Sequence, residues 1–273
     1  MSNYTYGGEK SHIGSTVGVF MLSLRLFQRT IGAKYRKSFL GYFWMVFPAL
    51  LITGGVSMAS RAGIINPGQI DLPYPLYVLM GTLVWQVFAE GVEIPYQAFE
   101  GARSYLTRVN FPRTAIVLAQ SYESLITTLV RVIVVLIMIA AFDKLTAVGT
   151  ALIIGGFFLT AFLGIGIGAI LAPFMMLFSD LHHTVKLILS YGLFLTPALY
   201  SPKAGELIST IVNLNPVSPL MHGVRDAAAV GMLGSPVSFW VTGVAALAFV
   251  LAGLALLRMA SPILIERMLI GGR

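Results

Sequence analysis

The sequence predicts an all-α, polytopic membrane protein, and its composition carries that prediction. Hydrophobic residues make up 57% of the 273 residues and charged residues only 11%, and the mean hydropathy is +0.84. Soluble chains carry roughly 25% charged residues, so a soluble fold is excluded. The 28 glycines and 13 prolines agree with this class, because both are commoner in membrane helices than in soluble ones. We treat residues 1–273 as one transmembrane domain.

Apolar stretches with few charged residues predict six transmembrane helices, because a helix crosses the hydrocarbon core with about 20 residues. They cover residues 39–60, 74–98, 114–142, 147–178, 184–200 and 237–257. The fourth exceeds one perpendicular crossing, so we expect it to tilt, to kink at Pro173 or to continue beyond the bilayer. An even number of spans places both termini on the same side.

Basic residues predict the orientation, since lysine and arginine collect on the cytoplasmic side of membrane spans. Most basic residues lie on one predicted side of the membrane: before the first span, between the second and third, beside the fifth and after the sixth. They are Lys10, Arg25, Arg29, Lys34, Arg36, Lys37, Arg103, Arg108, Arg113, Lys186, Arg258, Arg267 and Arg273. The opposite side has Arg61, Lys144, Lys203 and Arg225. Both termini are therefore predicted to be cytoplasmic, and the net charge of +7 follows topology rather than nucleic-acid binding.

Residues 19–38 predict an amphipathic helix at the membrane interface. Phe20, Leu24, Phe27, Ile31 and Tyr35 recur at helical spacing, and Arg25, Arg29 and Arg36 fall on the opposite face. Such a helix lies in the interface plane, with its arginines toward headgroups or a cytosolic partner. A plain membrane anchor remains an open interpretation.

The segment 201–234 is too apolar for a water-exposed loop and too broken for a span. Its apolar pieces, 207–214 and 220–232, are separated by Asn215-Pro216 and Ser218-Pro219. We expect two short re-entrant helices in the outer leaflet, where protein or a cavity covers their backbone.

Motifs for catalysis and cofactor binding are missing. The chain has no cysteine, none of its lysines lies in a phosphate-binding loop, and His182-His183 do not fit a zinc pattern. Gly164 and Gly168 lie in an apolar span and predict close helix packing rather than a dinucleotide site. We expect no catalytic residue, metal or cofactor in this chain.

Ionisable residues inside the second and third predicted spans need a protein or water environment, because lipid penalises charge. Glu90 and Glu93 share a helix face at i, i+3, which permits an intramembrane ion pair with Arg131. The pair would hold two helices together; a proton relay or a substrate contact is the alternative.

Several motifs resemble the permease subunits of type-2 ATP-binding-cassette (ABC) exporters of cell-surface polysaccharides. The segment AKYRKSFLGYFW at 33–44, followed by Pro48, resembles their N-terminal signature. Phe178-Ser179-Asp180-Leu181, Leu195-Thr196-Pro197-Ala198-Leu199-Tyr200, Asn215-Pro216 with Pro219, and Phe111-Pro112-Arg113 resemble further family motifs in order and spacing. Ser179 stands where the family commonly has arginine. The resemblance covers roughly residues 20 to 260.

The resemblance implies a six-span half-transporter in the bacterial inner membrane that forms a homodimer and pairs with two copies of a separate ATPase subunit, which binds ATP and Mg. It assigns ATPase contacts to Arg25, Arg29, Arg36, Glu100, Arg103, Arg108 and Arg113, and an outer gate to 201–234. The resemblance also implies that spans one and five line the channel. The aromatic residues nominated for polymer contact are therefore Tyr42, Trp44, Tyr191, Phe194 and Tyr200. Arg36 and Lys37 would meet the substrate's lipid phosphate or serve only as positive-inside anchors.

We therefore expect a channel subunit that exports a lipid-linked polysaccharide such as O antigen or capsule, with ATP hydrolysed by its partner. A related drug or antibiotic exporter would keep the fold. A membrane-embedded transferase would need a convergent acid/base or metal cluster, and the scattered carboxylates form none.

Overall fold

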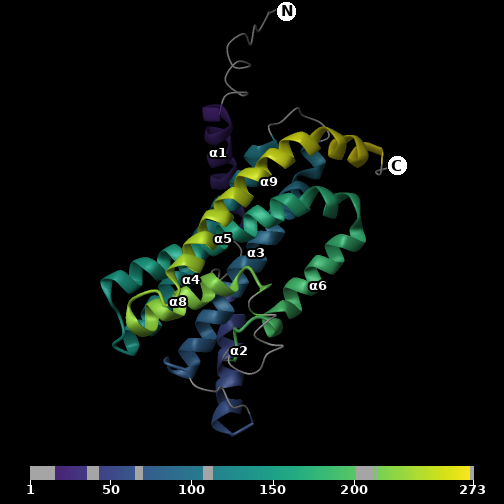
Figure 1. Ribbon diagram of the computed structural model, residues 1–273. Helices are drawn as coiled ribbons and strands as arrows, with labels where there is room; N and C mark the ends of the chain where they lie inside the picture. The colour runs from purple at the N-terminus through teal and green to yellow at the C-terminus, as the bar shows by residue number, and fades with distance from the viewer. Residues whose placement is uncertain are drawn as a thin grey trace, which may run out of the picture.

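The computed structural model describes residues 16–35, 43–64, 70–106, 113–200, 212 and 214–270. Every regular element in these ranges is a helix (Figure 1): α1 (Thr16–Tyr35), α2 (Phe43–Arg61), α3 (Tyr74–Leu106), α4 (Arg113–Ala141), α5 (Ala147–Leu177), α6 (Ser179–Leu195), α8 (Ser218–Val230) and α9 (Pro236–Ile270). The predicted all-α class is confirmed. Helices α3, α4 and α9 begin within one residue of the predicted spans, but α3 continues beyond 98 to Leu106 and α9 beyond 257 to Ile270.

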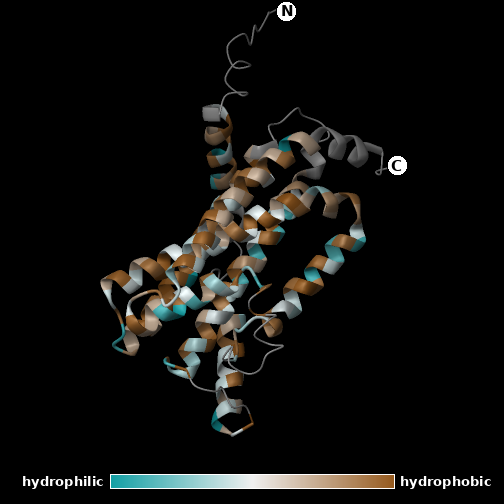
Figure 2. Ribbon diagram, viewed as in Figure 1, coloured by the Kyte–Doolittle hydropathy of each residue, from teal (hydrophilic) through white to brown (hydrophobic). Residues whose placement is uncertain are grey.

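Five helices are long and apolar enough to cross a membrane, over 43–61, 74–102, 115–141, 147–177 and 236–260. Apolar residues dominate their ribbons in Figure 2. Large apolar side chains also remain exposed on α4, at Ile133 and Ile137, and on α9, at Trp240, Val244 and Leu251. Exposed apolar faces of this extent suit lipid rather than water. The chain is a multi-pass membrane protein.

The fifth predicted span, 184–200, differs from the helix found there. Helix α6 begins at Ser179 and ends at Leu195, and its 17 residues rise about 26 Å, slightly less than the roughly 30 Å hydrocarbon core. Pro197 explains the early end, because proline has no N–H and disfavours helical geometry in the residue before it, and Thr196 is extended. Residues 196–200 form a turn, and a sixth crossing remains a prediction.

Helix α3 is the most buried of the five long helices and packs tightly against α5. A Cβ atom at Gly164 would lie 2.4 Å from the Phe88 carbonyl oxygen, and one at Gly168 would lie 2.3 Å from that of Val92. The backbones of α3 and α5 could not approach so closely if a larger residue stood at either position. The predicted packing role of Gly164 and Gly168 is confirmed.

Helix α1 packs against α4 through an aromatic cluster. Phe20 and Phe27 meet Tyr122 edge to face, with ring centroids 6.2 and 5.8 Å apart, and the buried Ser23 hydroxyl lies 3.3 Å from that of Tyr122. Part of the apolar stripe predicted for the acyl boundary therefore contacts protein. Phe20 stays 52% exposed, so lipid can still reach it.

Helix α8 occupies part of the predicted outer-gate segment and packs on α5. Leu220, Met221 and Val224 are fully buried, and Gly231 ends the helix in the left-handed conformation at φ 77°. The first predicted re-entrant piece, 207–214, falls largely outside the described residues. The second is a helix whose apolar face is covered by protein.

Candidate functional site

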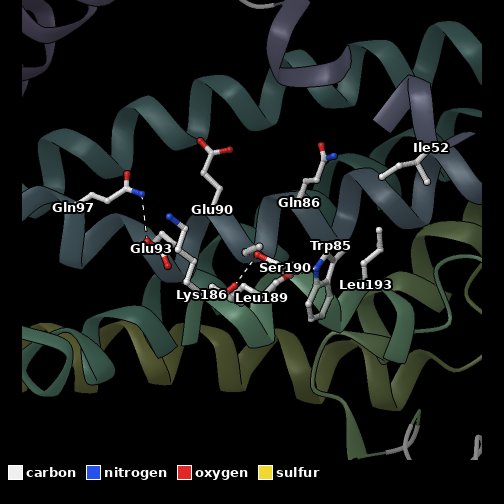
Figure 3. A pocket seen from close by; sticks show the side chains of 11 residues that line it. Ile52, Trp85, Gln86, Glu90, Glu93, Gln97, Lys186, Leu189, Ser190 and Leu193 are labelled. Carbon is white, nitrogen blue, oxygen red and sulfur yellow. Dashed lines mark hydrogen bonds between the residues drawn. The ribbon is translucent and has the colours of Figure 1, made fainter. Parts of the chain in front are cut away.

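A cavity of about 430 Å³ lies between α3 and α6, with one residue contributed by α2 (Figure 3). The α3 wall carries Trp85, Gln86, Ala89, Glu90, Glu93 and Gln97, the α6 wall carries Lys186, Leu189, Ser190 and Leu193, and Ile52 comes from α2. We call this cavity the α3–α6 groove. Its lining combines charged and amide side chains with apolar ones.

The polar residues of α3 form a stripe because of their spacing. Gln86, Glu90, Glu93 and Gln97 follow one another at steps of four, three and four, which keeps them on one face of a helix. Phe88 and Val92, which lie between them in sequence, supply the carbonyls that approach α5. The helix thus turns its packing face to α5 and its hydrogen-bonding face to the groove.

An ion pair anchors this stripe to α4. Arg131 Nη2 lies 2.6 Å from Glu90 Oε2, and the Thr127 hydroxyl donates to Glu90 Oε1 at 3.0 Å. The Arg131 side chain is 6% exposed and that of Glu90 is 31% exposed. Both carboxylate oxygens of Glu90 are therefore engaged, and its charge is balanced.

Glu93 was predicted as the second carboxylate of this ion pair, but it has different partners. Its Oε2 lies 3.3 Å from His182 Nε2 and accepts a hydrogen bond from Gln97 Nε2 at 3.4 Å. The His182 ring stacks on Tyr96 with centroids 3.9 Å apart. Three residues turn a helix by about 300°, so Glu93 points about 60° away from Glu90 and faces α6 instead of α4.

Trp85 joins the two walls of the groove. Its Nε1 donates to the Leu189 carbonyl at 2.9 Å, and a Cβ at Gly192 would lie 2.5 Å from Cζ2 of the ring. The ring is 7% exposed, so it serves as a spacer between α3 and α6 rather than as a free stacking surface.

Four of the aromatic residues nominated for the channel, Trp44, Tyr191, Phe194 and Tyr200, do not line this groove. Trp44, Tyr191 and Phe194 are 55%, 65% and 62% exposed, and Tyr200 is half-buried in the turn after α6. Tyr42 lies outside the described residues, as do Arg36, Lys37 and Arg108. Their channel and headgroup roles remain predictions.

The residues nominated for ATPase contact lie on α1, α3 and α4. Arg25 on α1 and Glu100 on α3 are exposed. Arg29, Arg103 and Arg113 belong to helices α1, α3 and α4, but their side chains are outside the described part of the structure. Figure 1 shows α1 at the same end of the molecule as the later part of α9.

A second polar site, which sequence reasoning missed, surrounds the turn 196–200. Arg225 of α8 is 4% exposed and donates to the carbonyls of Pro197, Ala198 and Tyr77. Tyr74 Oη donates to the Leu199 carbonyl at 3.0 Å, and Tyr77 Oη to that of Tyr200 at 2.9 Å. The backbone carbonyls of four successive residues, 197–200, thus accept hydrogen bonds from side chains of α3 and α8. We call residues 197–200 the carbonyl turn.

The carbonyl turn is also tied to the segment before α8. Asn215 Nδ2 donates to Thr196 Oγ1 at 2.8 Å, and Asn215 Oδ1 accepts from the Val217 N–H at 3.0 Å. Gly81 makes room, because a Cβ there would collide with the guanidinium of Arg225 and lie 2.7 Å from the Ala198 carbonyl oxygen. The one available signal was an arginine within a short, largely apolar segment, since a buried cation needs oxygen partners.

The described residues form a helical bundle of a multi-pass membrane protein, with a polar groove between two of its helices. The chain belongs to the ABC-2 type transporter family, whose model matches residues 22–229. Members of this family act in the membrane together with an ATPase partner.

Two curated relatives carry the same name. The O-antigen export system permease protein RfbA of Myxococcus xanthus is 26% identical over 211 residues, which cover 73% of this chain and 77% of that protein. The protein of that name from Klebsiella pneumoniae is 26% identical over 221 residues, which cover 79% and 83% of the two chains.

Proposed function

We propose that this chain is the channel-forming membrane subunit of an ATP-driven exporter that moves a lipid-linked polysaccharide, such as O antigen or capsule, across the bacterial inner membrane. The observation that carries the proposal is the family match over residues 22–229 together with two relatives named as O-antigen export permeases. Both similarities extend over most of the chain, and the family match ends before α9.

In this proposal the chain holds no nucleotide, metal or catalytic site of its own. Two copies of a cassette ATPase bind ATP and Mg and supply the energy. The exposed Arg25 and Glu100 are the contact residues whose side chains are described, and Arg29, Arg103, Arg108 and Arg113 complete the proposed contact. The distribution of basic residues supports cytoplasmic termini on the ATPase side.

A second copy of the chain completes the proposed channel. Helix α6 leaves a row of large apolar side chains uncovered, namely Leu187, Ile188, Tyr191, Phe194 and Leu195. Aromatic rings on this face suit a sugar polymer, because the C–H faces of pyranose rings stack on them. Trp44, Tyr42 and Tyr200 belong to the same proposed lining, and Arg36 and Lys37 to a site for the lipid phosphate.

To test this proposal, the gene is deleted in its host and the deletion is complemented with a tagged copy of the chain. The tagged chain is then purified by affinity. We expect loss of the surface polysaccharide, its recovery on complementation, and a cassette ATPase purifying with the tagged chain in equal amount. Unchanged surface polysaccharide, or a chain that purifies without an ATPase, contradicts the proposal.

A further inference from the structure

Helix α6 is held lightly by the rest of the described bundle. Its buried residues are Val185, Gly192 and Leu193. Its exposed large apolar residues are Leu187, Ile188, Tyr191, Phe194 and Leu195. Hydrophobic burial does little to fix the rotation of such a helix, because lipid tails are as apolar as these side chains. Specific contacts must therefore decide which face of α6 meets α3.

Trp85 of α3 makes two contacts with the backbone of α6. Its Nε1 donates to the Leu189 carbonyl at 2.9 Å, and Figure 3 shows its side chain beside Leu189. Three residues further along α6, a Cβ at Gly192 would lie 2.5 Å from Cζ2 of the indole and 2.8 Å from Cη2. The ring thus occupies the space that a side chain at Gly192 would take. Leu189 and Gly192 are about 60° apart around the helix, which places both contacts on one face.

Two other contacts between α6 and α3 leave more freedom. His182 meets Glu93 through two side chains at 3.3 Å, and the carbonyl turn lies beyond the end of α6. Side chains can adjust when a helix turns, whereas a backbone carbonyl and the bare backbone of a glycine turn with it. The indole is itself fixed, because it is 7% exposed and packs on Phe88 with ring centroids 5.4 Å apart. Trp85 is therefore the contact that specifies the rotation.

The rotation decides where the aromatic residues of α6 point. Successive residues of a helix are about 100° apart, so Tyr191 is turned about 100° from Gly192 to one side and Phe194 about 160° to the other. With Gly192 against Trp85, both rings face away from α3, and they are 65% and 62% exposed. Rotation by a single residue would put Tyr191 in the place of Gly192.

We propose that Trp85 is a positioning residue, which sets the rotation of α6 and thereby directs Tyr191 and Phe194 toward the polymer path. This inference rests on the proposed export function, in which these two residues contact the polymer. It adds a residue of α3 that acts through α6, because the buried indole is already occupied by the two helices.

The rotation of α6 can be measured directly because the chain has no cysteine. Single cysteines are placed in turn at positions 184–191, 193 and 194 and spin-labelled, in the complete complex with a cysteine-free ATPase partner in lipid nanodiscs. The accessibility of the labels to oxygen oscillates with the period of the helix, about 3.6 residues, and the phase of the oscillation gives the rotation. With Trp85 present, we expect the minimum on the face of Leu189.

Gly192→Ala and Trp85→Leu test the contact from its two sides. Alanine places a methyl group against the indole, and leucine removes both the ring and the N–H donor. We expect each to shift the phase by roughly 30° or more of the 100° per residue, and to lower export in the complemented deletion strain. Gly192→Ala combined with Trp85→Phe should restore part of the phase, because phenylalanine lacks the Cζ2 and Cη2 atoms that meet the methyl group.

The matched control is Trp240→Leu on α9, which removes a tryptophan that is 54% exposed. It should leave the phase as in wild type. If Trp85→Leu gives no intact complex, the comparison of Gly192→Ala with its double variant decides alone.

The outcomes separate this inference from the proposed function. An unchanged phase in Gly192→Ala and Trp85→Leu overturns the inference, and so does a double variant that stays as shifted as Gly192→Ala. An equal shift in Trp240→Leu overturns it as well, because the effect would not be specific to this contact. A shifted phase with undiminished export overturns the link from rotation to polymer contact. The proposed function fails separately, when the deletion strain keeps its surface polysaccharide or the chain purifies without an ATPase.

Discussion

The guanidinium carbon of Arg225 lies 3.5 Å above the centre of the Tyr77 ring. The same arginine donates to the Tyr77 carbonyl at 3.0 Å, while the Tyr77 hydroxyl donates to the Tyr200 carbonyl at 2.9 Å. Tyr77 is therefore held at its ring, its backbone and its hydroxyl. Through Tyr77, α8 and the turn after α6 are joined to α3, the most buried of the five long helices.

Replacing Arg225 should be strongly destabilising. Arg225→Met leaves the Pro197 and Ala198 carbonyls without their cationic donor, and each buried acceptor left unpaired costs about 1–3 kcal/mol. Arg225→Lys should recover only part of the loss, because one ammonium cannot reproduce the planar fork and its stacking on Tyr77. We expect the melting midpoint in detergent to be highest for wild type, lower for Arg225→Lys and lowest for Arg225→Met.

The matched control for Arg225 is Arg61→Met. Arg61 is an exposed arginine at the end of α2, on the same predicted side of the membrane, so its loss should leave the midpoint unchanged. Equal midpoints for Arg225→Met and Arg61→Met would show that the carbonyl turn does not depend on the arginine.

Adding a methyl group at Gly164 should separate α3 from α5. The new Cβ would lie 2.4 Å from the Phe88 carbonyl oxygen, and a backbone atom cannot move aside as a flexible side chain can. We expect Gly164→Ala to cost about 1–3 kcal/mol, as overpacking usually does. Gly155 on the same helix has open space at its Cβ, so Gly155→Ala should be neutral or stabilising by up to about 1 kcal/mol. Denaturant titration of both variants in mixed micelles measures the difference.

The apolar length of a helix can be predicted from sequence, because it depends on consecutive residue types alone. For that reason the starts of α3, α4, α5 and α9 agree with the predicted spans to within one residue, whereas α6 begins and ends five residues before the predicted span 184–200. The close packing at Gly164 and Gly168 was also predictable, since small residues in an apolar span have few other uses.

The partners of Arg225 and the direction of Glu93 could not be predicted in the same way. Arg225 binds backbone carbonyls, which every residue has, so the turn it recognises has no signature in residue type. Glu90 and Glu93 differ by about 60° around α3, and only the rotation of that helix against its neighbours decides which carboxylate meets Arg131. The groove itself depends on the tilt of α6, which the identity of its residues does not specify.

The Arg131–Glu90 pair should stabilise the contact between α3 and α4. Removing one partner of a buried ion pair costs about 3–5 kcal/mol, but the Glu90 side chain is 31% exposed, so we expect roughly 2–3 kcal/mol for Arg131→Met. Glu90→Gln combined with Arg131→Met should recover part of the loss, because no charge is then left unpaired. A double-mutant cycle on unfolding free energies measures this coupling, and additive effects would contradict it.

Asn215 should couple the carbonyl turn to the start of α8 through a single hydrogen bond. Its Nδ2 donates to Thr196 Oγ1 at 2.8 Å, whereas its Oδ1 serves the local turn at Val217. Thr196→Val and Asn215→Ala each remove the shared bond, so the double variant should lose about 1 kcal/mol less than the sum of the single losses. When this coupling energy is subtracted from the free-energy loss of Asn215→Ala, the remainder measures the hydrogen bond from the Val217 N–H to Asn215 Oδ1. Additivity within about 0.3 kcal/mol would mean that the two segments are held together by Arg225 and the tyrosines alone.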